Sequence, residues 1–71
     1  MTRDDALRVV NVALVADGGC YVCAGSCMQT ARHMWPGFDW AGLAEFTPEE
    51  WPGSEYDIED ARQLLKGERD D

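Results

Sequence analysis

The feature that most constrains this chain is a cluster of three cysteines, Cys20, Cys23 and Cys27, in a sequence that has no other cysteine. The only histidine, His33, follows six residues after the last of them. A chain of 71 residues buries limited apolar surface, and domains of this size often gain stability from a metal ion, disulfides or a partner chain. The cluster therefore predicts that the fold is held together near residues 20–33.

Zinc is the metal that this spacing favours. Thiolates are strong ligands for Zn²⁺, and the two cysteines of a Cys-x₂-Cys pair can reach one common ion. Cys23 and Cys27 would share a face if both lie on a helix, because residues four apart are neighbours there. We predict a structural zinc site at Cys20, Cys23 and Cys27 that joins the first two helices. His33 is the expected fourth ligand only if the helix starts after Cys27 or frays before its end, since on one regular helix the two residues stand about 120° apart.

Other interpretations of the cluster stay open. Asp17, Asp39 or a residue of a second chain are the alternatives to His33 as fourth ligand. The three thiols could instead be reduced, buried side chains of the core, with His33 exposed at a helix end. The alternative with chemistry of its own is an iron–sulfur cluster, or a thiol redox or sensor site, at the same three cysteines.

The charge of the chain excludes some partners and favours others. Fourteen acidic residues face six basic ones, so the formal net charge is −8. Such a chain repels phosphate backbones, because nucleic-acid affinity comes largely from Lys and Arg side chains that displace counterions. Direct nucleic-acid binding is therefore not expected. An anionic surface can instead dock on a basic protein surface, including one that normally holds nucleic acid. The plainer interpretation is that the acidic residues only confer solubility.

The sequence predicts a cytoplasmic protein with no membrane segment. The apolar run Val9–Ala16 has the length of a signal-peptide core, but Asp4 and Asp5 stand where such a peptide carries positive charge, and Asn11 interrupts the run. No stretch approaches the length of a membrane span. An odd number of cysteines argues against a disulfide framework and fits a reducing compartment.

Hydrophobic periodicity predicts a single small, mainly α domain over residues 1–71, with about three short helices. The first runs from about residue 4 to 16, where Thr2 begins a capping box and the apolar stripe is Leu7, Val10 and Leu14. A strand is the alternative for this segment, because its four valines favour extended backbone.

Two further helices follow from similar patterns. The second is expected to start at residues 24–26 and to end at Trp35, before Pro36, with Cys27, Ala31 and Met34 on one face. The third begins at the capping box of residues 54–57 and runs to about Lys66, with a buried face formed by four apolar residues, Ile58, Ala61, Leu64 and Leu65. Gly67 stops it, and residues 68–71 are expected to form a frayed acidic tail.

Five of the seven aromatic residues lie between Trp35 and Trp51, in a loop rich in proline and glycine. Within it, residues 47–50 carry the cap signature of one short helical turn. We expect the aromatic rings to fold over the core as a lid. In the alternative, Trp40 and Trp51 stay partly exposed as anchors for a protein partner. An acidic rim would then steer that partner by its positive charge, and its members are Asp39, Glu45, Glu49, Glu50 and Glu55.

No arrangement of residues points to catalysis, because His33 has no serine or cysteine partner at a recognisable spacing. We therefore predict that the chain is not an enzyme. The predicted function is that of a small, acidic, zinc-stabilised protein-binding module. It would act as an adaptor, regulator or inhibitor that docks on a basic partner surface, in its sharpest form as a DNA mimic. A homo-oligomer is compatible with this function, and the iron–sulfur or thiol redox protein is the alternative.

Overall fold

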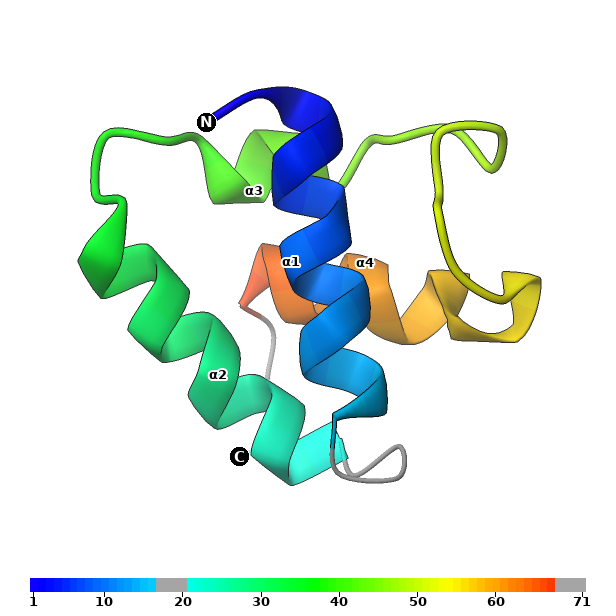
Figure 1. Cartoon of the computed structure of the whole chain (residues 1–71), viewed down its shortest axis with the longest axis horizontal. Helices are drawn as coiled ribbons and strands as arrows, with labels where there is room; N and C mark the ends of the chain where they lie inside the picture. Colours follow the sequence, from blue (N-terminus) through cyan, green and yellow to red (C-terminus); the bar gives the residue numbers. More distant parts are fainter. Residues whose placement is uncertain (17–20, 68–71) are drawn as a thin grey trace.

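The computed structural model describes residues 1–16 and 21–67, and its arrangement of helices is shown in Figure 1. These residues form four α-helices and one turn of 3₁₀-helix, and no β-strand occurs among them. The elements in chain order are α1 (Arg3–Val15), α2 (Tyr21–Met34), α3 (Trp40–Leu43), η1 (Glu55–Asp57) and α4 (Ile58–Lys66). The expectation of a small, mainly helical fold is thus confirmed, whereas its stapling by a metal stays a prediction.

Helix α1 forms where its capping residues predict it. The Thr2 hydroxyl accepts a hydrogen bond from the Asp5 backbone N–H at 3.1 Å, which satisfies one of the donors left open at the start of the helix. Leu7, Val10 and Leu14 are buried, as the stripe requires. Helix, and not strand, is therefore the conformation of this segment.

Helix α2 differs from its prediction in both its start and its buried face. It begins at Tyr21, several residues earlier than expected. Among residues 23–34, Ala24, Met28 and Ala31 are buried, whereas Cys27 is exposed and Met34 has 63% of its surface exposed. The predicted buried face is therefore correct for Ala31 and wrong for Cys27 and Met34. The two alanines allow neighbouring helices to approach closely, so packing against α1 and α4 sets which side of α2 turns inward.

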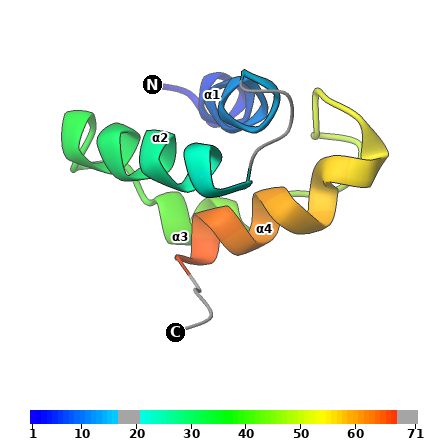
Figure 2. The ribbon, with the colours of Figure 1, turned by 90° about the horizontal axis from the view of Figure 1, so that it is seen from below.

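The helices stack in layers around one core. Helix α1 packs against α2 and α4, α2 also contacts α4, and the short α3 lies against α4. Figure 2 shows α1 almost end-on, on one side of α2 and α4. The core draws on every α-helix and on the loop between α3 and η1, and its residues are Ala6, Leu7, Val10, Ala13, Leu14, Ala24, Met28, Ala31, Trp40, Leu43, Ala44, Phe46, Trp51, Ala61, Leu64 and Leu65.

The two ends of the third predicted helix are as expected. Ser54 caps η1 by accepting from the Tyr56 backbone N–H at 3.2 Å, and α4 continues from it. Gly67 ends α4 in the left-handed conformation, with φ of 73°, which costs glycine little because it has no Cβ. Ala61, Leu64 and Leu65 are buried and Ile58 is partly buried. The predicted acidic tail at 68–71 lies outside the described residues.

Candidate functional site

Half of the acidic residues of the chain lie in one stretch, which we call the acidic segment (residues 45–60). It holds no Lys, Arg or His, and its formal charge of −7 accounts for nearly all of the net −8. The segment comprises the loop after α3, the turn η1 and the first residues of α4. Its acidic residues are Glu45, Glu49, Glu50, Glu55, Asp57, Glu59 and Asp60.

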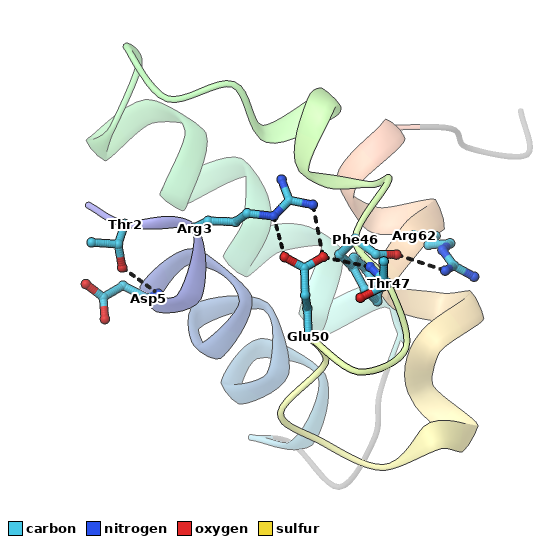
Figure 3. Close-up of polar contacts among 7 residues, drawn as sticks. All are labelled: Thr2, Arg3, Asp5, Phe46, Thr47, Glu50 and Arg62. Atoms are coloured by element: carbon cyan, nitrogen blue, oxygen red, sulfur yellow. Dashed lines mark hydrogen bonds and ion pairs between the residues drawn. The ribbon is translucent and has the colours of Figure 1, made fainter.

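An arginine at the start of α1, Arg3, binds the loop of this segment (Figure 3). Arg3 donates from Nε to Oε2 of Glu50 at 2.7 Å and from Nη2 to Oε1 at 3.2 Å. The same carboxylate accepts a hydrogen bond from the Thr47 backbone N–H at 2.7 Å. This bond is half of a capping box, so the cap signature at 47–50 is present, although the backbone there forms turns and not a helix.

These contacts hold the pKa of Glu50 well below its ordinary value of 4.5, at about 2. The hydrogen bonds from Arg3 are the largest cause, followed by the bond from the Thr47 N–H, since both favour the ionised carboxylate. The same pairing raises the pKa of Arg3. Both side chains face solvent, which screens the pair, so the pair contributes little to stability at any pH.

A pH titration tests this pairing. Because the pKa of Glu50 is lowered on folding, the contact stabilises the fold above about pH 4.5, and this contribution is lost as the pH falls towards 2. In an NMR titration of the side-chain carboxyl carbons, Glu50 should titrate near pH 2, and Arg3→Gln should move its midpoint upward. A Glu50 midpoint near 4.5 in the unmodified chain would mean that Arg3 does not hold it.

A second arginine fastens the other end of the loop, from α4. Arg62 donates to the Phe46 carbonyl oxygen at 3.0 Å, and its guanidinium carbon lies 5.0 Å from the centre of the Phe46 ring. The Phe46 ring in turn stacks on Trp51, with 5.3 Å between the ring centres. The Trp51 indole N–H donates to the Ser54 carbonyl oxygen at 2.8 Å. Charged groups on α1 and α4 and two stacked rings therefore fix the course of the loop.

This loop, η1 and the start of α4 border a shallow hollow of about 610 Å³ that is open to solvent. Trp51 lines it but is only 6% exposed, whereas Tyr56 is 86% exposed. Gly53 also lines the hollow and lies against α1, where a Cβ atom at this position would come within 2.1 Å of the Asn11 side-chain oxygen. The lining residues are Pro48, Trp51, Gly53, Glu55, Tyr56, Ile58 and Glu59.

The positive charges that the structure describes are mostly used inside the fold. Arg3 pairs with Glu50 and Arg8 with Asp4, while Arg32 and Arg62 donate to backbone carbonyl oxygens. Among the described carboxylates, only those of Asp4 and Glu50 take part in an ion pair. The remaining acidic side chains of the acidic segment thus face solvent without a neutralising partner from the described part of the chain.

The two tryptophans named as partner anchors belong to the core. Trp40 is 4% and Trp51 6% exposed. The Trp40 indole N–H donates to the Trp35 carbonyl oxygen at 3.3 Å, so the polar atom of each indole has an internal partner. The interpretation of these rings as a lid over the core is therefore the one that fits, because an anchor needs an exposed ring.

Two of the five residues of the predicted acidic rim, Asp39 and Glu50, are engaged in contacts within the fold, so only part of the rim is free to meet a partner. Asp39 is the N-cap of α3 and accepts from the Gly42 backbone N–H at 2.9 Å, while Glu50 is held by Arg3. Glu49 is exposed. The sequence interpretation missed Tyr56 and Glu59, although Tyr56 precedes Ile58 by two residues and so stands outside the buried stripe of α4.

Two of the predicted zinc ligands are described, and Cys20, like the alternative ligand Asp17, lies outside the described residues. Cys23 is partly buried and Cys27 exposed, and both lie on α2, so their spacing of four does place them on one face. His33 lies on the same unbroken helix. Its predicted role as fourth ligand required a break in that helix, and among the described residues no three His, Cys, Asp or Glu side chains are grouped closely enough to hold a metal. His33 therefore stands apart from Cys23 and Cys27.

The zinc prediction at the three cysteines can be tested by elemental analysis of protein purified under reducing conditions. We expect one zinc per chain. The Cys23→Ser/Cys27→Ser variant should lose both the zinc and the cooperative fold. His33→Ala should keep the zinc, because this residue lies apart from the cysteines on α2. Iron in place of zinc would favour the iron–sulfur alternative. A metal-free chain whose variant folds normally would contradict both metal sites and leave the cysteines as reduced thiols.

Comparison with known proteins finds no family model that matches the chain, and no curated protein or solved structure that matches it at a significant level. None of the described helices is both long and apolar enough to cross a membrane. A function for this chain must therefore be argued from the chemistry of the site itself.

Proposed function

We propose that this chain is a small protein-binding module that docks its acidic segment on the basic surface of a partner protein. The observation that carries the proposal is the distribution of charge. Residues 45–60 combine seven acidic side chains with no basic one, next to a hollow with apolar walls. Opposite charges on two surfaces speed their encounter and suppress binding to wrong partners.

The way the acidic segment is held supports this proposal. Arg3 and Arg62 fasten its loop from two different helices, and the stacked Phe46 and Trp51 rings fix the backbone between them. A loop that is ordered before binding loses less conformational entropy when a partner docks. Solubility alone would not require the acidic residues to be concentrated in one ordered segment.

A partner surface that normally binds nucleic acid is the sharper form of this proposal. A compact surface with a formal charge of −7 over sixteen residues offers such a partner carboxylates in place of phosphates. Duplex DNA would then compete with the chain for the same partner. A basic partner that binds the chain and DNA simultaneously would exclude mimicry and leave protein binding in place.

The proposal is tested by measuring the affinity of the chain for an oligo-arginine peptide by calorimetry, between about 20 and 300 mM salt. We expect the affinity to fall steeply as the salt concentration rises, because salt screens exposed charges. Glu49→Gln/Asp60→Asn should weaken binding about fivefold, since each exposed charge contributes a fraction of a kcal/mol to about 1 kcal/mol.

The matched control is Asp4→Asn/Asp5→Asn, which changes the net charge by the same amount at the start of α1, outside the acidic segment. It should weaken binding by less than about twofold. Equal losses in the two variants would show that net charge alone attracts the peptide. No measurable binding by the unmodified chain at low salt would overturn the proposed function.

A further inference from the structure

We infer that the hollow beside Tyr56 receives one arginine side chain of the partner protein. This inference rests on the proposed function and assigns the contact that gives it specificity. Long-range charge attraction brings any basic surface to the acidic segment, but it does not select a particular side chain. A hollow that combines apolar surface, an aromatic ring and carboxylates does, because a side chain must match this chemistry as well as the charge.

The apolar part of the hollow suits the stem of a long side chain. Pro48, Trp51 and Ile58 contribute ring and aliphatic surface to its walls. Arginine buries its methylene stem along such surfaces while its charged end stays near water. Trp51 is held in place by its bond to the Ser54 carbonyl oxygen and by the Phe46 ring, so this wall is present before a ligand arrives.

The exposed Tyr56 ring supplies a face for the guanidinium group. The ring is 86% exposed, although it lines the hollow, so most of its surface is open to a ligand. A planar guanidinium stacks on an aromatic face through cation–π attraction, and it is more weakly hydrated than the ammonium of lysine. Tyrosine is also among the residues that most often dominate binding energy at protein interfaces.

Glu55 and Glu59 supply the negative charge of the hollow. Both residues line the hollow where η1 continues into α4. Two carboxylates at one hollow attract a cation from a partner. The positive end of the α4 dipole accounts for acidic residues near its start, but it does not account for an apolar hollow with an exposed ring beside them.

The charge of the hollow is unmatched within the described chain. No Lys, Arg or His lines it. The two arginines that hold the loop, Arg3 and Arg62, donate to Glu50 and to the Phe46 carbonyl oxygen. Glu55 and Glu59 are both exposed and have no ion pair with the residues that the structure describes. A partner's arginine would therefore complete the site without displacing an existing contact.

The test uses three capped pentapeptides, Gly-Gly-X-Gly-Gly, in which X is arginine, lysine or citrulline. Citrulline has nearly the shape of arginine but carries no charge. In an NMR titration of the labelled full chain, we expect the arginine peptide to shift the amide signals of Gly53, Tyr56 and Ile58. The lysine peptide should bind several-fold more weakly, and the citrulline peptide should cause no saturable shift.

Two variants locate the contact. Tyr56→Ala and Glu55→Gln/Glu59→Gln should each weaken binding of the arginine peptide about fivefold, because each removes one part of the hollow. All three side chains are exposed, so both variants should fold normally. Equal binding of the arginine and lysine peptides, or unchanged affinity in both variants, would overturn the arginine assignment.

Different binding results would overturn the arginine site and the proposed docking function. If oligo-arginine binds the chain with the salt dependence described above, but both hollow variants bind the arginine peptide like the unmodified chain, the hollow is not the site and the docking function stands. If oligo-arginine does not bind the unmodified chain at all, both are wrong.

Discussion

Phe46→Ala is expected to lower the free energy of unfolding by about 3–5 kcal/mol, the usual cost of removing a buried phenylalanine ring. Phe46 is 1% exposed, stacks on Trp51 and lies beneath the Arg62 guanidinium. A domain of this size has a total stability of about 4–10 kcal/mol, so the variant should lose between about a third and all of it. Urea denaturation followed by far-ultraviolet circular dichroism measures the effect.

Tyr56→Ala is the matched aromatic control for this variant. Its ring is 86% exposed, so the free energy of unfolding should change by no more than about 0.5 kcal/mol. Comparing Phe46→Ala with Tyr56→Ala distinguishes the ring that holds the acidic segment in place from the ring that is exposed to a partner. A loss below about 1 kcal/mol for Phe46→Ala would show that the loop does not depend on this ring.

Arg32→Met is expected to cost about 1.5–3 kcal/mol of stability. The Arg32 guanidinium, on α2, donates to the carbonyl oxygens of Leu64 and Leu65, the latter at 3.1 Å. These carbonyls belong to the last turn of α4, where the helix itself leaves acceptors unsatisfied and where positive charge is favoured. Methionine keeps the apolar stem but removes the donor of the Leu65 carbonyl oxygen, whereas the Leu64 oxygen keeps its bond from the Gly67 backbone N–H.

Arg8→Met serves as the control for the loss of an arginine. Arg8 pairs with Asp4 on the exposed surface of α1, at a spacing of four and at 3.2 Å, and such pairs contribute about 0.3–0.5 kcal/mol. Thermal unfolding of the two variants, monitored by circular dichroism, should therefore show a clear loss only for Arg32→Met. Equal midpoints would mean that α2 and α4 are held together by apolar packing alone.

The helices with strong local signals could be predicted from the sequence, because their ends are fixed by nearby residues. The Thr2 cap and the Gly67 stop act within one turn of backbone, so their geometry needs no knowledge of the rest of the fold. Helix α3 was not predicted, since four residues are too few for an apolar stripe to repeat. Its one local indication was Asp39, which was assigned to a partner surface and in fact caps the helix.

The buried face of α2 could not be predicted, because it depends on which helices pack against it. Cys27 and Met34 are apolar enough to be buried, and the smaller Ala24 is buried instead. The local sequence allows either face, and close contact with α1 and α4 favours the side that carries alanine.

The candidate site was predicted in its charge but not in its shape. The acidic residues of the rim can be counted in the sequence, whereas the hollow requires Trp51 to be buried and Tyr56 to be exposed. Trp51 lies in the loop after α3 and Tyr56 in η1, and the contacts of Arg3 and Arg62, together with the burial of the stacked Phe46 and Trp51 rings, decide how this stretch lies on the helices. The two arginine contacts join residues 47 and 16 positions apart, which no local pattern reveals.

Mapping where oligo-arginine binds, by the shifts it causes in the backbone amide signals of the labelled chain, tests most directly whether the acidic segment is the docking surface. We expect the largest shifts within residues 45–60, with Gly53, Tyr56 and Ile58 among them, and a return to the unbound signals when salt is added. Shifts that are spread evenly over the exposed faces of α1 and α2, or centred there, would contradict docking through the acidic segment.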